Sequence, residues 1–259
     1  ECDWSSDVCS SDLFNLEQSK GVVSDMKYKT SFLILFSFSV SLIAGDLLGT
    51  VKYEGKAPKR KAVRMDSDPV CGASHQAKVY NESFIVDEKG NMANVLVYLK
   101  DVKFDGDTPT DPVILDQSGC MYSPHVSGVI AGQNVKILNS DATMHNIHGL
   151  PKVNKEFNFG MPKTVKEKVI SFEKAEDVFK VKCDVHPWMR SYIQVFNHPY
   201  FAVTSSDGSF KISDIPPGQY EVIAWQEKFS PRYGILEKSV TIGKESTELI
   251  LTFKRPDKK

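Results

Sequence analysis

The chain carries the sequence VKCDVHPWMR at residues 181–190, a short loop that holds a thiol, an imidazole and a thioether. Residues 178–181 before it and 191–196 after it are rich in β-branched and aromatic residues, a pattern that predicts two strands. Two strands that end in one short loop hold its side chains rigidly, as a preorganised metal site requires. We therefore expect Cys183, His186 and Met189 to face one point.

A second imidazole comes from the sequence DATMHNIH at residues 141–148. A thiolate and two imidazoles in a plane, with a weak thioether on the axis, suit copper that cycles between Cu(II) and Cu(I). A zinc site would favour a fourth thiolate, imidazole or carboxylate over a thioether. The donor types therefore predict a copper cofactor.

The motif C-x2-H-P-[WF]-M-R at 183–190 resembles the ligand loop of amicyanin, in the plastocyanin and azurin family of blue-copper cupredoxins. The earlier loop resembles the family's first-ligand loop through Asn139, Asp141, His145, Asn146 and His148. The resemblance covers about residues 116–196. It implies a cupredoxin Greek-key β-sandwich with one type 1 copper ion. The implied ligands are His145, Cys183, His186 and Met189. His148 is the alternative to His145, which is favoured because the family's ligand directly precedes Asn.

A different pattern begins near residue 198. Residues 204–222 read TSSDGSFKISDIPPGQYEV, with an Asp-Gly turn, a Pro-Pro-Gly corner and two short strands. This pattern resembles the carboxypeptidase regulatory-like, transthyretin-like β-sandwich, and residues 236–242 and 247–253 supply its closing strands. At Gln226, after Trp225, this family leads us to expect His, so we assign no function there.

These patterns predict an all-β chain with a cupredoxin domain at 46–197, which includes N-terminal extension strands, and a smaller sandwich at 198–259. Residues 47–53 are expected to add an edge strand to that smaller sandwich. Helical periodicity is scarce.

Residues 1–25 look foreign to the rest, and residues 4–13 resemble a translated sequencing adapter, so we expect a non-native or disordered leader. Residues 26–45 read as a signal peptide, with a basic start at Lys27 and Lys29, an apolar run at 31–44 and small residues at 44–45. We expect export to the periplasm or outside the cell, with cleavage near Asp46. An uncleaved N-terminal membrane anchor is the alternative, because Leu42 or Ile43 stands where a small residue is preferred.

After residue 45 the sequence has Cys71, Cys120 and Cys183. With Cys183 as a copper ligand, Cys71 and Cys120 can form a disulfide in an oxidising compartment. Free thiols are a second interpretation. A third is a second metal site made by Cys71, His75, Cys120 and His125.

Four protein ligands leave no open position for a substrate, so we expect an electron carrier and no enzyme. His186 should be the exposed-edge ligand, and a redox protein partner should dock near His186, Pro187 and Trp188. Core packing explains Trp188 equally well. The chain has 32 basic and 33 acidic residues, which indicates no nucleic-acid partner.

The alternative function is a copper-binding or surface-binding structural module, for copper storage or delivery, without electron transfer. A copper enzyme with a water ligand is a weaker alternative, which requires that Met189 does not bind. Asn146 is expected, by resemblance, to tie the His145 loop to the Cys183 loop.

Overall fold

The computed structural model describes residues 44–256, and this part of the chain is nearly all β, as the sequence predicts. The leader at 1–25 and the signal peptide, apart from its last two residues, lie outside the described residues. Two short helices, α1 (Pro69–Ala73) and α2 (Ser230–Tyr233), interrupt the strands. Within residues 44–256 no helix is both long enough and apolar enough to cross a membrane.

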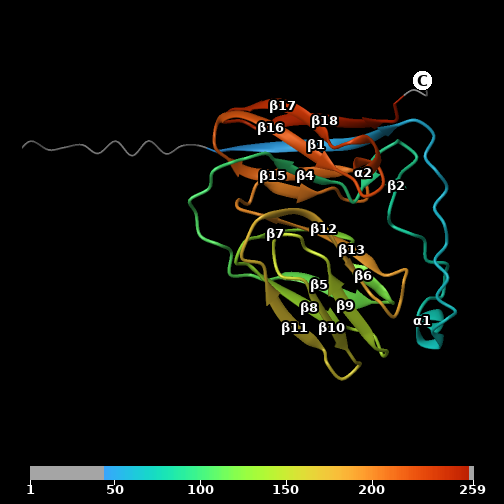
Figure 1. Cartoon of the computed structure of the whole chain (residues 1–259). Coiled ribbons are helices and arrows are strands. Elements are labelled where there is room, and N and C mark those ends of the chain that lie inside the picture. The colour runs from blue at the N-terminus through green and yellow to red at the C-terminus, as the bar shows by residue number, and fades with distance from the viewer. Residues whose placement is uncertain (1–43, 257–259) are drawn as a thin grey trace, which may run out of the picture. The chain divides into compact units, whose positions relative to one another are not determined.

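The first sandwich contains both the earliest and the latest strands of the described chain (Figure 1). One of its sheets has the order β15-β1-β18 and the other the order β14-β4-β16-β17. Its strands are β1 (Gly45–Glu54), β4 (Leu96–Leu99), β14 (Phe201–Val203), β15 (Ser209–Ile215), β16 (Gly218–Trp225), β17 (Leu236–Ile242) and β18 (Thr247–Lys254). Buried side chains from both sheets form one core, with Leu47, Val97, Val222 and Leu251 among them.

Strand β1 does join the C-terminal sheets, but it lies between two partners and not at an edge. It runs antiparallel to β15 and parallel to β18, with Leu47 opposite Thr247. Strand β4 likewise pairs with both β14 and β16. The division at residue 197 stays a prediction as a domain boundary, but these early strands pair with the strands that follow it.

The second sandwich has the sheet orders β10-β9-β12-β13-β7 and β11-β8-β5-β6. Its strands are β5 (Val113–Ser118), β6 (Met121–Ser123), β7 (Val126–Ile130), β8 (Asn134–Asn139), β9 (His145–Gly149), β10 (Phe157–Met161), β11 (Glu167–Ser171), β12 (Glu176–Lys182) and β13 (Arg190–Phe196). Alternate residues of β8 are buried, which places Val135 and Ile137 in the core. A separate two-stranded pair joins β2 (Ile85–Val86) to β3 (Met92–Ala93).

Strand pairing brings the two motifs of the sequence together. Strand β12 pairs with β9, with Lys182 opposite His148, and with β13 on its other side. Residues 183–189 form the loop between β12 and β13, and His145 begins β9. The first-ligand loop and the cysteine loop therefore meet at one end of the same sheet.

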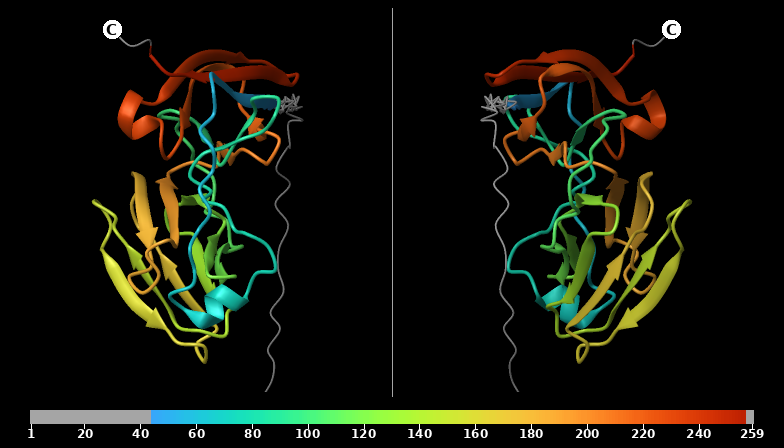
Figure 2. Two further views of the ribbon diagram at one scale, coloured as in Figure 1. Left: turned by 90° about the vertical axis from the view of Figure 1, so that its right-hand side faces the viewer. Right: turned by 90° about the vertical axis from the view of Figure 1, so that its left-hand side faces the viewer.

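The chain between β1 and β2 runs alongside both groups of strands and contains α1 (Figure 2). Asp68 caps α1 by accepting the backbone N–H groups of Val70 at 2.8 Å and Cys71 at 3.2 Å. The predicted disulfide between Cys71 and Cys120 is confirmed, and it ties α1 to the turn between β5 and β6. We refer to residues 68–74 as the cap segment.

Candidate metal centre

Three buried side chains place their donor atoms together. One ligand atom from each of His145, Cys183 and His186 lies within 4.8 Å of the others. The two imidazole Nδ1 atoms are 2.9 Å apart, and Cys183 Sγ is 3.8 Å from Nδ1 of His186. Three of the four predicted ligand residues thus converge, two from the cysteine loop and one from β9.

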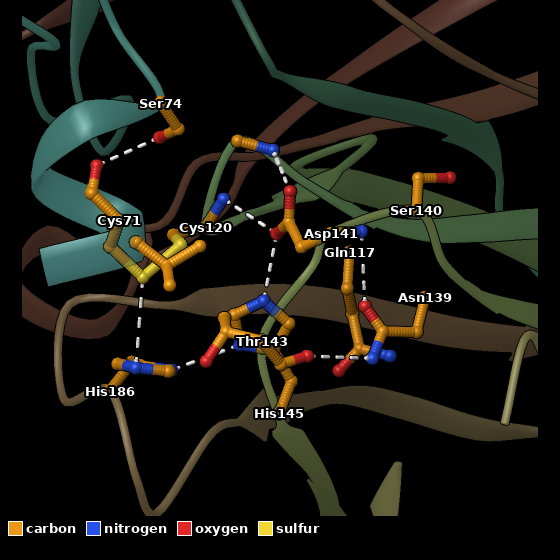
Figure 3. Close-up of polar contacts among 12 residues, drawn as sticks. Cys71, Ser74, Gln117, Cys120, Asn139, Ser140, Asp141, Thr143, His145 and His186 are labelled. Atoms are coloured by element: carbon orange, nitrogen blue, oxygen red, sulfur yellow. Dashed lines mark hydrogen bonds and ion pairs between the residues drawn. A yellow bond between two sulfur atoms is a disulfide. The ribbon is translucent and has the colours of Figure 1, made fainter. Parts of the chain in front are cut away.

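The outer nitrogen of each imidazole faces a carboxylate. Nε2 of His145 is 2.7 Å from Oδ2 of Asp141, and Nε2 of His186 is 3.0 Å from Oδ2 of Asp68. Figure 3 shows Asp141 between the His145 ring and the Cys120 turn. Because an ionised carboxylate only accepts hydrogen bonds, each ring carries its proton on Nε2. The two Nδ1 atoms then face each other, an arrangement that a proton on one of them or a metal ion between them stabilises.

Asp141 is held by the turn that precedes β6. Its carboxylate accepts the backbone N–H groups of Gly119 at 2.7 Å and Cys120 at 2.8 Å. Both turn residues have positive φ, as a two-residue type I′ turn requires. Burial raises the pKa of Asp141, but the His145 hydrogen bond and these N–H groups outweigh it and lower the pKa. Asp141 therefore stays ionised and orients His145.

The electrostatics favour a thiolate beside a cationic partner. Burial raises the pKa of Cys183, but a hydrogen bond from His145 and the backbone N–H groups of Asn146 and His186 lower it overall. Burial lowers the pKa of His145, but hydrogen bonds to Asp141 and Cys183 raise it to about 9. A lowered thiol pKa favours the thiolate form that binds metal.

Met189 is fully buried at the end of the same loop. Its N–H donates to the carbonyl of His186 at 2.9 Å, and its carbonyl accepts from Cys183 N at 3.3 Å. The loop is therefore closed on itself by its backbone. Cys183, His186 and Met189 of this loop, together with His145 of β9, combine soft sulfur with imidazole, and this donor set fits copper.

The alternative ligand His148 lies elsewhere. Its Nδ1 faces Asp184 Oδ2 at 2.8 Å, and its Nε2 faces Glu156 Oε1 at 3.0 Å. It is absent from the donor groups found among the described residues. The geometry favours His145.

Asn146 makes the ties that the resemblance implies. Its backbone N–H points at Cys183 Sγ at 3.4 Å, and its side-chain oxygen accepts the N–H of Asp184. It therefore connects the start of β9 to the cysteine loop and restrains Cys183.

The expectation that His186 is an exposed-edge ligand is wrong. His186 is 2% exposed, because the cap segment covers the outer side of its ring. The carboxylate of Asp68 accepts a hydrogen bond from Nε2 of His186. Cys71 Sγ lies 3.7 Å from the same nitrogen (Figure 3). Sequence reasoning missed Asp68; the available signal was an Asp directly before Pro69, which is typical of a helix N-cap.

The second-metal and free-thiol interpretations of the other cysteines are also wrong, since both sulfur atoms are in the disulfide. His75 bonds to the carbonyl of Gly119 at 2.6 Å, and His125 faces Glu227 Oε2 at 2.7 Å. Cys183 is the free cysteine among residues 44–256.

Trp188 packs inward and does not stand free on the surface. It is half-buried, and its Nε1 donates to the carbonyl of Cys120 at 3.0 Å. Its ring centroid lies 5.0 Å from that of His186. These contacts support the interpretation that Trp188 serves in packing.

Comparisons with known proteins give partial likenesses. Residues 180–249 match the family model described as polysaccharide lyase family 4, domain II. No curated protein matches. Among solved structures, a Cu-containing nitrite reductase from Thermus scotoductus SA-01 is 20% identical over 37% of this chain, with a TM-score of 0.31. This chain covers 25% of that one.

Two smaller solved structures are similar over most of their own length. A purple cupredoxin from Nitrosopumilus maritimus is 24% identical, over 32% of this chain and 99% of that chain, with a TM-score of 0.28. A Cu(I) form of a mutant amicyanin is 22% identical, over 39% of this chain and 98% of that chain, with a TM-score of 0.30. These neighbours are cupredoxins. The likeness covers about a third of this chain and concerns the fold alone.

Proposed function

We propose that this protein is an exported type 1 copper protein that carries one electron at a time between redox partners. The observation that supports it most is the pair of Nδ1 atoms facing each other at 2.9 Å, beside Cys183 Sγ and with both outer nitrogens held by carboxylates. The proposed ligands are His145, Cys183, His186 and Met189.

When bound, copper would supply reversible one-electron exchange between Cu(II) and Cu(I). Cys183 would contribute negative charge and a soft sulfur, and the imidazoles would keep both oxidation states acceptable. Asp141 and Asp68 fix the orientation of the two rings. Because the two imidazoles and the thiolate are held by partners outside the ligand set, the site would change little when its charge changes, which is what rapid electron transfer requires.

The redox partner is proposed to dock over the covered His186. Exposed apolar side chains lie on the segments that meet there: Val70 in α1, Met144 directly before His145, and Val185 in the cysteine loop, with exposures of 41%, 49% and 46%. Pro187 is also exposed. Transient redox complexes use small interfaces of this kind. The electron would then pass the cap segment, where Cys71 Sγ touches the His186 ring.

Copper storage or delivery is the alternative from another functional class. A delivery protein needs an open site from which the metal can leave. Here the three donors are buried and the cap segment is held by a disulfide. These features favour electron transfer over exchange. An enzymatic role is not proposed, since four protein ligands leave no position for a substrate.

A visible absorption spectrum and a redox titration of the copper-loaded protein test the proposal. We expect an intense visible thiolate-to-copper band that disappears on reduction and returns on oxidation, as for a His2Cys site with a weak axial ligand. A colourless copper complex, or loss of copper on each reduction cycle, would instead support the storage or delivery function.

Export rests on the sequence of residues 26–45. N-terminal sequencing of the protein from a secreted or periplasmic fraction should give a start near Asp46. A chain that still begins at Met26 in a membrane fraction would contradict cleavage.

A further inference from the structure

The first sandwich bears a strongly basic groove with a volume of about 360 Å³. Its lining includes six basic side chains and no acidic one: Lys59, Arg60, Lys61, Lys228, Arg232 and Arg255. The whole chain has 32 basic and 33 acidic residues, so a random surface would mix the two signs. The separation of charge in this groove therefore calls for an explanation.

The groove is assembled from segments far apart in the sequence. Lys59 to Lys61 belong to the irregular chain after β1, Arg232 belongs to α2, and Arg255 follows β18. Folding, and not a local run of lysines, brings these charges together. A basic stretch that only contacts solvent would not be joined by basic residues from two other segments of the chain.

Most of these charges have no carboxylate partner. Lys228 pairs with Glu227 at 3.4 Å. No carboxylate of residues 44–256 lies within ion-pair distance of the other five basic groups. Like charges repel, so such a cluster costs stability until an anion occupies it.

One of these cations is already held in place. Arg60 donates to the backbone carbonyls of Asn81 at 3.0 Å and Tyr80 at 3.1 Å, and its guanidinium lies 5.7 Å from the centre of the Tyr80 ring. Less conformational entropy is therefore lost when it meets an anion.

Aromatic rings share the groove with the cations. Phe84 and Tyr233 line it, and Tyr233 is 40% exposed. A ring next to cations suits a ligand that has both flat apolar faces and anionic groups. The basic residues themselves are exposed, whereas a small-molecule site usually encloses most of its ligand. An open groove fits a segment of a polymer better than an isolated small molecule.

We propose that this groove binds an acidic polysaccharide, with sugar carboxylates on the basic side chains and a sugar ring against Tyr233. Single-stranded nucleic acid also combines rings with anionic groups. The disulfide between Cys71 and Cys120 favours the carbohydrate, because such bonds persist outside the cytosol. This site is separate from the copper residues and does not depend on the proposed electron transfer.

The experiment is calorimetric titration of the whole protein with oligogalacturonate. The variant Lys59→Gln/Lys61→Gln/Arg232→Gln should bind about tenfold more weakly or worse, since it loses three charge pairs of the exposed kind. The control Lys163→Gln/Lys174→Gln/Lys244→Gln removes the same charge from exposed positions outside the groove and should bind like the unchanged protein. Equal weakening of both variants would reduce the effect to net charge and overturn the proposal.

Tyr233 provides the second test. Tyr233→Ala should weaken oligogalacturonate binding but leave inorganic pyrophosphate unaffected, and Tyr233→Phe should restore sugar binding. Thermal melting of each variant checks that the fold is kept. No binding of oligogalacturonate by the unchanged protein, or tighter binding of single-stranded DNA of matched length and charge, would overturn the polysaccharide assignment.

Discussion

His145 and His186 turn their Nδ1 atoms toward each other because a carboxylate holds the other nitrogen of each ring. Asp68 is 118 positions from His186 in the sequence, yet it sets the orientation of that ring. The motifs predicted which residues meet, because the spacing around Cys183 belongs to one loop. They could not predict which nitrogen of His186 points inward, since that depends on the long-range contact with Asp68.

Cys183→Ser tests the thiolate. A hydroxyl neither supplies soft sulfur nor ionises at neutral pH, so we expect the visible band to vanish and copper to be held weakly. The measurement is the absorption spectrum during copper titration. An unchanged spectrum would end the type 1 copper assignment.

The two histidines of β9 provide a matched comparison. His145→Ala should open the copper to water and bleach or shift the visible band, whereas His148→Ala should leave spectrum and potential unchanged. His148 contacts Asp184 and Glu156 and not the donor group. A changed spectrum in His148→Ala with an unchanged one in His145→Ala would indicate that His148 is the ligand.

Asp68→Asn tests the carboxylate that faces His186. Loss of a negative charge beside the ligand should disfavour Cu(II), so we expect the reduction potential to rise by on the order of 60 mV, which is a tenfold change for one electron. Asp66→Asn, at a nearby exposed position, is the charge-matched control. Equal shifts of the reduction potential in the two variants would mean that the loss of negative charge causes the shift and that the hydrogen bond to His186 does not contribute.

At the scale of elements, the cap segment is the part of the site that neither sequence motif predicted. Its sequence is irregular and charged, and helix α1 is only 5 residues long. Cysteine counting predicted its covalent tie. The cap segment covers His186 because the disulfide places α1 beside that ring. Sequence periodicity does not predict this position of the helix.

Cys71→Ala/Cys120→Ala should release the cap segment. The bond joins residues 49 positions apart, so its removal should lower the free energy of unfolding by about 4 kcal/mol in the chain-entropy account. The visible band should persist, because Cys183 remains, but a Cu(I) chelator should extract copper faster. Urea unfolding and chelator kinetics measure the two effects. An unchanged extraction rate would show that the cap segment does not limit access.

At the scale of the whole molecule, hydrophobic alternation and turn residues were enough to predict an all-β chain. They did not predict that β1 lies between β15 and β18, or that β4 joins β14 and β16. A strand has the same local pattern whichever partner it takes. Partner choice is decided by long-range packing, such as Leu47 and Leu251 in one core.

His198 predicts how the fold responds to acid. It is buried, its Nδ1 accepts the N–H of Tyr200 at 3.2 Å, and burial holds its pKa below the usual range. The unfolded chain binds the proton first as pH falls through about 6.5, so stability is lost on acidification from there toward the lower folded pKa. In urea unfolding at pH 7 and pH 5, His198→Asn should lose less stability than the unchanged protein. Identical losses would assign the effect to other groups.

The position of β1 has a consequence for how the protein is made. The first described strand and the last one, β18, lie parallel from Leu47 and Thr247 onward, so β1 leaves the ribosome well before its partner β18. Until β18 arrives, β1 presents an unpaired side that can join another chain. A product truncated before residue 247 should therefore aggregate or be degraded even though all four proposed copper ligands are present.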